Sequence, residues 1–332
     1  MSRVTAIAPS NIAFVKYWGA SDLERALPVN QSLSMTLSRC VTRTTVERLD
    51  GGEDTVLVRS SAGELLPASA AFTAGVERHL AALRHELEVE GAFRIATENT
   101  FPSSAGIASS ASGFTALAIA VCGSLGIEPE PRDLSRLARA SGSGSAARSV
   151  VGGYVVWPGD PEDSGSPMRQ VATARHWELC DVVTVVDTTA KPVPSREGHR
   201  RAASSPYFSR RLEQLPGRLQ AASQAVLDRD LARLGPIVET EAIDLHLIAM
   251  SSVPPIFYWR PQTLEVLERV WALRDEGVEV WATLDAGPNL HLICEPESEP
   301  TVVEAIGRLP GVRTLIRDRV GSGPARSEEH LF

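Results

Sequence analysis

The sequence predicts an α+β protein built from two layered halves. Its strand-like segments gather before and after long helical runs and do not alternate with helices one by one. The later part of the chain is mostly helical, over 209–250 and again over 262–276. A loose stretch rich in Gly, Pro and acidic residues, 160–167, separates the two halves. This order favours a two-layer α+β arrangement over a doubly wound parallel sheet.

The first half opens with two predicted strands. Residues 4–15 alternate apolar and polar side chains, and residues 33–49 are rich in Thr and Val. Helical periodicity follows over 71–90, and 93–97 has the pattern of another strand. A nearly all-apolar helix is expected over 110–125, and such a helix belongs at the centre of a fold.

The remaining elements are shorter. A helix over 132–141 leads into a Gly-rich segment, 142–148, and a strand follows at 154–157. In the second half, three buried strands are expected at 182–186, 280–284 and 290–294. The last two flank the turn D-A-G-P-N.

Composition and charge limit the class of protein. The chain has 332 residues, of which 43% are hydrophobic, and a formal net charge of −8. An acidic protein lacks the general basic surface that nucleic acids or anionic membranes require, so neither partner is expected. Four widely spaced Cys residues suggest neither a disulfide framework nor a zinc site. The N-terminus resembles neither a signal peptide nor a membrane span, and a cytoplasmic location is expected.

The segment 99–111, N-T-F-P-S-S-A-G-I-A-S-S-A, has the composition of a phosphate-binding loop. Small residues let the backbone approach an anion, and the first N–H groups of the next helix point toward it. The alternative is a Ser-rich loop that only caps a core helix. The candidate nucleotide-binding residues are Pro102, Ser103, Ser104, Ala105, Gly106, Ala108, Ser109 and Ser110.

Three other segments carry polar residues at the ends of predicted elements. The first, 9–19, presents Asn11, Lys16 and Tyr17 beside a Gly, although a Lys at a strand end is often only solvated. The Gly-rich segment 142–148 offers Arg148, which suits a carboxylate or phosphate, or is a surface residue of a flexible turn. Asp285 directly follows an apolar strand, where it is either partnered and catalytic or merely begins a turn.

Together these segments resemble the GHMP kinase superfamily, and within it the mevalonate diphosphate decarboxylases. The matching motifs occur in the family's order over nearly the whole chain: K-Y-W-G at 16–19, L-P-V-N-Q-S-L-S at 27–34, F-P-S-S-A-G-I-A-S-S-A at 101–111, G-S-G-S-A-A-R-S-V-V-G-G-Y at 142–154, S-R-E-G at 195–198 and D-A-G-P-N at 285–289. The resemblance implies a GHMP kinase fold with lobes over 1–180 and 181–332 and a deep cleft between them. It also implies ATP and Mg²⁺ as cofactors, a phosphorylated mevalonate as substrate, and a homodimer.

The resemblance also implies a role for each residue. Asp285 matches the Asp near the substrate's 3-hydroxyl, as base or as orienting charge, and Lys16 matches the Lys beside it. Arg148 matches the Arg that binds the substrate carboxylate, with Asn11 close by to orient it. Either Ser109 or Ser110 is expected to reach the β,γ-phosphates and Mg²⁺. The expected contacts to the substrate phosphate are Tyr17, Ser143, Ser145 and Arg196, and Ser195 is also expected to bind the substrate.

The chain departs from the family at two places. Ala20 and Ser21 stand where diphosphate enzymes usually have a second Lys and an Arg, and His199 stands where the family often has Met. A phosphate brings roughly −1.5 to −2 charges that need partners. We therefore hypothesise a preference for 5-phosphomevalonate, which would give isopentenyl phosphate. The alternatives are 5-diphosphomevalonate, a kinase of the mevalonate type that does not decarboxylate, and a non-catalytic ligand sensor on the same fold.

Overall fold

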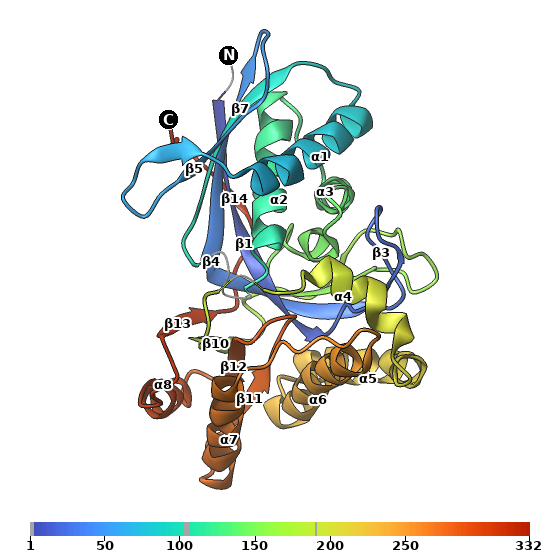
Figure 1. Cartoon of the computed structure of the whole chain (residues 1–332), viewed down its shortest axis with the longest axis vertical. Coiled ribbons are helices and arrows are strands. Elements are labelled where there is room, and N and C mark those ends of the chain that lie inside the picture. The colour runs from blue at the N-terminus through green and yellow to red at the C-terminus, as the bar shows by residue number, and fades with distance from the viewer. Residues whose placement is uncertain (1–2, 103–106, 190) are drawn as a thin grey trace.

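The computed structural model describes residues 3–102, 107–189 and 191–332. Its upper half in Figure 1 is built on a twisted sheet whose long central strands are β1 (Arg3–Val15), β4 (Ser32–Leu49) and β7 (Ala92–Asn99). The strand order is β14-β1-β4-β7-β5-β6, and β8 and β9 extend the sheet from β4. The shorter strands are β5 (Thr55–Arg59), β6 (Leu65–Pro67), β8 (Tyr154–Trp157), β9 (Arg169–Ala172) and β14 (Ala325–Ser327).

Helices α1 (Ala70–Leu87), α2 (Ser109–Ser124) and α3 (Pro131–Arg139) cover one face of this sheet (Figure 1). The apolar α2 lies against β1 and β4, with Ala116, Ala120 and Val121 buried in one cluster with Phe93 of β7. Small residues let this helix lie close to the sheet, as its nearly uniform apolar character predicts. The short 3₁₀ helix η1 (Gly144–Arg148) packs against both α2 and α3.

The lower half contains an antiparallel sheet of order β11-β12-β10-β13. Its strands are β10 (Cys180–Val185), β11 (Val280–Thr283), β12 (Leu290–Cys294) and β13 (Thr314–Arg319). Helices α7 (Pro261–Asp275) and α8 (Glu299–Gly307) bury Leu267 and Val302 in one cluster with Val182 and Leu292 of this sheet. Helices α5 (Phe208–Asp228) and α6 (Leu231–Ser251) pack on each other and against β1.

The two halves share a hydrophobic core. Ile12 of β1, Val183 of β10, Leu215 of α5 and Val238 of α6 belong to one buried cluster. The chain also returns to the first sheet at its end, because Ala325 of β14 pairs with Ile7 of β1. The lower end of β1 therefore lies between the two halves, held from both sides. The division into lobes 1–180 and 181–332 stays a prediction.

The α+β prediction is confirmed, with small shifts of the boundaries. The central helix begins at Ser109, one residue before the predicted start, and β8 and β12 lie where the sequence places them. Some short elements were not predicted, among them the two-stranded ribbon of β2 (Ala20–Asp22) and β3 (Leu27–Pro28) and helix α4 (Ser195–Arg201). Elements of this length are too short for periodicity to identify.

All four cysteines are buried and free. Within the described ranges, no helix combines the length and apolar character needed to cross a bilayer.

Candidate active site

A cavity of about 350 Å³ opens between the two halves of the molecule. The cavity joins the end of β1, the start of α2, η1, α4 and the turn after β11. The predicted site residues that line it are Lys16, Tyr17, Ala108, Ser109, Ser110, Ser143, Ser145, Arg148, Ser195, Arg196 and Asp285. Asn11 and Pro102 are not part of its wall, and Ser103, Ser104, Ala105 and Gly106 fall outside the described residues.

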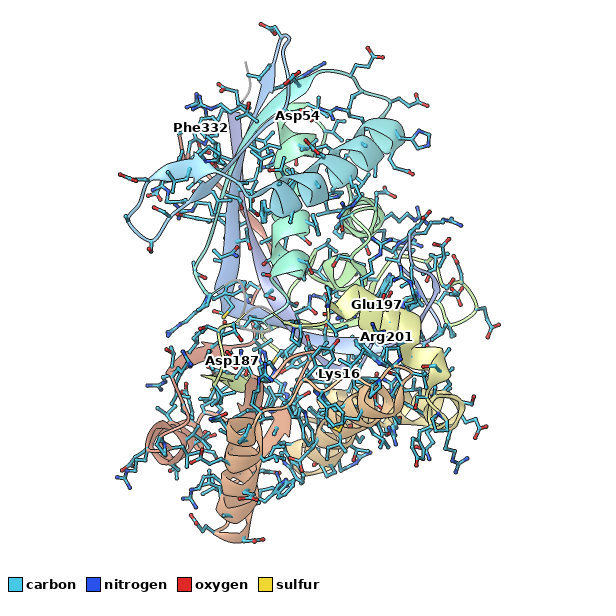
Figure 2. The ribbon with its side chains drawn as sticks, in the orientation of Figure 1. Lys16, Asp54, Asp187, Glu197, Arg201 and Phe332 are labelled. Carbon is cyan, nitrogen blue, oxygen red and sulfur yellow. The ribbon has the colours of Figure 1, made fainter. Side chains whose placement is uncertain are left out.

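Lys16 and Asp285 form an ion pair at the floor of this cavity. The Lys16 Nζ donates to Asp285 Oδ1 at 2.9 Å and to the Ala13 carbonyl at 2.7 Å. The lysine side chain is 1% exposed, whereas that of Asp285 is 27% exposed. The ammonium is therefore enclosed by protein, and the carboxylate keeps a free edge that a ligand can reach. Figure 2 labels Lys16 near the middle of the molecule, where β1 ends.

For each member of this pair, burial and the neighbouring charges shift the pKa in opposite directions. Burial lowers the pKa of Lys16, and the neighbouring Asp285 offsets only part of this shift. For Asp285, burial alone would raise the pKa, but Lys16, His291 and Arg148 outweigh it and the pKa lies below its usual value. Asp285 is therefore a carboxylate at neutral pH.

A buried charge network fixes the backbone at Lys16 from behind. The Glu241 carboxylate on α6 is fully buried, and it accepts from the Lys16 backbone N–H at 3.1 Å. It also accepts from Arg211 at 2.8 Å and from Arg218 at 2.5 Å. Arg211 in turn donates to the Lys16 carbonyl at 2.8 Å. Buried charges are tolerated only when they are paired, and here the pairing joins α5 and α6 to the end of β1.

Arg148 lies at the end of η1, and its guanidinium is held on two sides. It donates to Ser32 Oγ at 2.7 Å through Nη1, and to Asn11 Oδ1 at 3.3 Å through Nε and 3.1 Å through Nη2. The Asn11 amide nitrogen donates to the Ser145 carbonyl and to Ser149 Oγ. Asn11 is 1% exposed and does not line the cavity, and its predicted place among the substrate-binding residues stays a prediction. Its hydrogen-bonding groups are occupied in holding Arg148 and η1.

Gly144 allows η1 to approach the end of β1. A Cβ at this position would lie 2.6 Å from a ring carbon of Tyr17 and 2.8 Å from one of Trp157. Such distances are far below van der Waals contact, so only glycine fits here without a shift. The close approach brings the hydroxyls of Ser143 and Ser145 to the cavity, 3.1 Å from each other.

The start of α2 forms another wall. Ala108 precedes the helix with φ of 38°, and the Ser10 hydroxyl donates to the carbonyls of Ile107 and Ala108. Ser110 Oγ lies 3.3 Å from Ser143 Oγ, which links the first turn of α2 to the η1 segment. The helix start has no acidic residue in its first turn and no side-chain cap, so it suits an anion.

Helix α4 supplies the remaining wall. Gly198 packs on Trp18, where a Cβ would lie 2.3 Å from a ring carbon. This contact directs Ser195, Arg196 and His199 to the cavity. Two further cations of the wall, Lys191 and Arg78, stand in no recognisable motif of the sequence and were not predicted. Burial lowers the pKa of Lys191, and Asp285 partly offsets this shift.

The wall therefore concentrates positive charge in an acidic protein. Five cationic side chains face the cavity, namely Lys16, Arg78, Arg148, Lys191 and Arg196. The only acidic side chain that lines the cavity within the described ranges is Asp285. No group of three or more His, Cys, Asp or Glu side chains suited to a metal ion occurs among the residues that the structure describes. The cavity is built for a polyanion, with one carboxylate beside it.

Fold and cavity together define an enzyme of the GHMP kinase superfamily. The model of the "Diphosphomevalonate decarboxylase-like N-terminal domain" matches residues 8–168, and that of the "Mevalonate 5-diphosphate decarboxylase C-terminal domain" matches residues 181–326. The chain belongs to the diphosphomevalonate decarboxylase family and is an ATP-dependent decarboxylase. The predicted superfamily, family and enzyme class are confirmed.

Curated relatives and solved structures agree with this assignment. The chain is 36% identical to a diphosphomevalonate decarboxylase of Aspergillus fumigatus, over 94% of this chain and 81% of the relative. It is 31% identical to the diphosphomevalonate decarboxylase of Candida albicans, over 100% of this chain and 99% of the relative. The structure matches a complex of MDDEF with MVAPP, AMPPCP and magnesium at a TM-score of 0.89, with 32% identity, covering 98% of this chain and 99% of the other. The structure also matches that of the mevalonate diphosphate decarboxylase from Staphylococcus aureus. The TM-score is 0.89 and the identity 29%, and the match covers 98% of each chain.

Proposed function

We propose that this enzyme converts 5-diphosphomevalonate and ATP into isopentenyl diphosphate, CO₂, ADP and phosphate. The observation that carries the proposal is that the Lys16–Asp285 pair, Arg148 and the start of α2 line one and the same cavity. A relative's complex with MVAPP and AMPPCP, at 32% identity, supports both ligands. The relatives' names support the diphosphate over our first hypothesis of a monophosphate.

The chemistry proceeds in two stages. The tertiary 3-hydroxyl oxygen forms a bond to the γ-phosphorus of ATP as the bond to the β-phosphate oxygen breaks, which releases ADP. The C3–O bond then breaks to release phosphate, and the electrons of the C1–C2 bond form the new double bond as CO₂ departs. Phosphorylation is needed because hydroxide is a poor leaving group.

Asp285 acts on the 3-hydroxyl through its exposed carboxylate edge. Because its pKa is held low, the carboxylate is ready to accept the hydroxyl proton or to orient it. It also places a negative charge beside the cationic centre that develops at C3. Lys16 keeps the carboxylate in place and offers positive charge to the transferring phosphoryl group.

Arg148 binds the carboxylate that becomes CO₂. A guanidinium offers two parallel N–H bonds to a carboxylate, and Asn11 and Ser32 fix its plane before substrate arrives. This fixes the C1–C2 bond relative to the departing phosphate, which is a positioning effect.

The start of α2 and the nearby cations hold the phosphate groups. Ser109 and Ser110 would hold Mg²⁺ through their hydroxyl oxygens, a ligand type that this ion accepts. When bound, Mg²⁺ supplies charge neutralisation at the β,γ-phosphates. Lys191 and Arg196 supply positive charge near the substrate's own phosphates.

A second candidate substrate is 5-phosphomevalonate, because Ala20 and Ser21 provide no cation next to the cavity. In this case the same steps would give isopentenyl phosphate.

The test is a parallel assay of ADP and CO₂ release with mevalonate, its 5-phosphate and its 5-diphosphate. We expect both products in equal amounts and the highest kcat/KM with the 5-diphosphate. A higher kcat/KM with the 5-phosphate would select the second candidate. ADP without CO₂ would indicate a kinase, and no ADP from any of the three compounds would refute both candidates. The reaction without ATP serves as the control.

A further inference from the structure

His199 occupies a defined place in the cavity wall that the proposed mechanism does not use. Its ring lies against Tyr17, with the ring centroids 4.2 Å apart, and against Trp18 at 4.8 Å. Gly198 beside it packs on Trp18 without room for a Cβ. The imidazole is therefore fixed by the K-Y-W-G segment, and it lines the cavity together with Arg196 of the same helix.

One hydrogen bond determines the tautomer of this ring. The Gly19 backbone N–H donates to His199 Nδ1 at 3.1 Å. Since Nδ1 must accept this bond, it carries no proton, and in the neutral ring the proton is on Nε2. None of the described residues accepts a hydrogen bond from Nε2. His199 therefore brings a fixed N–H donor that a ligand can use.

The ring stays uncharged at the pH of the cell. Burial, and to a smaller extent the nearby Arg211, lower the pKa of His199 to about 3, although Asp285 acts in the opposite direction. A lysine or arginine at this position would add a full positive charge. His199 adds only a directed hydrogen bond.

We propose that His199 is a specificity-determining residue that donates its Nε2–H to the phosphate group at C5 of the substrate. This inference rests on the proposed function, because it assumes a 5-phosphorylated mevalonate in the cavity. The residues that surround His199 indicate that it faces the phosphate at C5 and not the reacting carbon. His199 lies against Tyr17 and shares α4 with Arg196, and both line the cavity and are residues that the resemblance to the family assigns to the substrate phosphate.

A neutral donor at this place affects how the enzyme distinguishes phosphate chains. It orients a phosphate oxygen without compensating an additional negative charge. It is also a rigid ring where the resemblance to the family gives a flexible methionine. His199 thus contributes to affinity for the phosphate group through geometry, and the nearby cations contribute through charge.

The kinetic test compares H199M with H199Q. We expect H199M to raise the KM for the phosphorylated mevalonate about tenfold, which corresponds to one hydrogen bond to a charged group. The KM for ATP and kcat should change less than about threefold, since neither rests on this bond. H199Q should restore most of the affinity, because the amide can accept from Gly19 and still donate.

Controls separate a binding role from a folding defect. H85Q changes an exposed histidine on α1, away from the cavity, and should leave all constants unchanged. An unchanged substrate KM in H199M, with H199M folded as judged by circular dichroism, would overturn the proposal. So would a KM in H199Q as high as that in H199M.

A second measurement does not depend on turnover. Nitrogen-15 NMR of histidine-labelled enzyme should show the His199 ring protonated at Nε2, and this N–H should shift when 5-phosphomevalonate, 5-diphosphomevalonate or inorganic pyrophosphate is added. Unphosphorylated mevalonate should not shift the Nε2–H signal. The role of His199 is refuted if the proton lies on Nδ1. It is also refuted if the Nε2–H signal shifts with none of the three phosphate compounds. The absence of any turnover in the wild type would instead refute the proposed function.

Discussion

The two ends of the cavity are prepared for their ligands in different ways. At the reacting end, Lys16 and Arg148 are buried and already bound to protein groups on several sides. In the part of the wall that α4 forms, Arg196 is exposed and makes no hydrogen bond or ion pair with another described residue, and the Nε2–H of His199 has no acceptor among them. Both sets of residues present donors, but only those of the reacting end are already bound to protein acceptors before substrate binds.

The difference follows the demands of the reaction. Groups that stabilise a developing charge act best when they need no rearrangement, so their geometry is fixed by burial and by partners such as Glu241 and Asn11. Groups that only bind a phosphate can be left unpaired, because the ligand itself completes their hydrogen bonds. Tight packing at the first end and open polar groups at the second are therefore both functional.

Removal of the Asp285 carboxylate should cause the largest loss of activity. D285N keeps the size of the side chain but loses its basicity and its charge, and we expect kcat to fall about 10³-fold, within the range for a positioned base. ADP and CO₂ release should fall together. D133N, which changes an exposed carboxylate on α3, is the control and should behave as wild type. A loss of less than about tenfold in D285N would contradict the role of Asp285.

A smaller effect is expected from R148K, which keeps the charge but removes the planar fork. Lysine cannot hold both Asn11 and Ser32 as the guanidinium does, so the substrate carboxylate would be held less well. We expect kcat/KM to fall about 10²-fold, the size of effect attributed to a misplacement of about 1 Å. R136K on the exposed face of α3 is the matched control. If R148K has the kcat/KM of wild type, planar recognition of the carboxylate is refuted.

The mildest test is the pH dependence of kcat. Burial places the pKa of Lys16 below 10.5, so activity should decline as the pH rises through this lowered value and the ammonium loses its proton. Asp285 has a lowered pKa, so it should cause no loss of activity on the acid side down to about pH 4. K16R, whose guanidinium stays charged, should be less active but should lack the alkaline decline. The same decline in K16R would assign it to another group.

Local patterns in the sequence account for much of the fold. The long elements β1, β4, α1, α2 and α7 are recognisable because each is long enough to show an apolar period, a run rich in Thr and Val, or a nearly all-apolar run. Several of the short elements were not predicted, because a few residues carry little periodic signal. Helix α4 has seven residues, and its place depends on the contact between Gly198 and Trp18.

The sequence motifs identified the reacting residues, but not the buried charged residues that hold the backbone at Lys16. Lys16, Arg148 and Asp285 stand in segments of unusual composition, whereas Glu241 and Arg211 are single charges in long helices and are indistinguishable from solvated residues in the sequence. The structure places both in the interior against the end of β1. A buried charge of this kind could have been found only from the packing of α5 and α6.

By itself the sequence determined the family, the α+β class and the residue types that perform the chemistry, because short motifs and periodic patterns are local properties of the chain. The tertiary structure decided which of these residues meet. Lys16 and Asp285 are 269 positions apart, and their 2.9 Å contact exists only because two sheets pack around a shared core. It also moved Asn11 from the cavity to the layer behind it and oriented His199, because burial and hydrogen-bond geometry depend on neighbours that are distant in the chain.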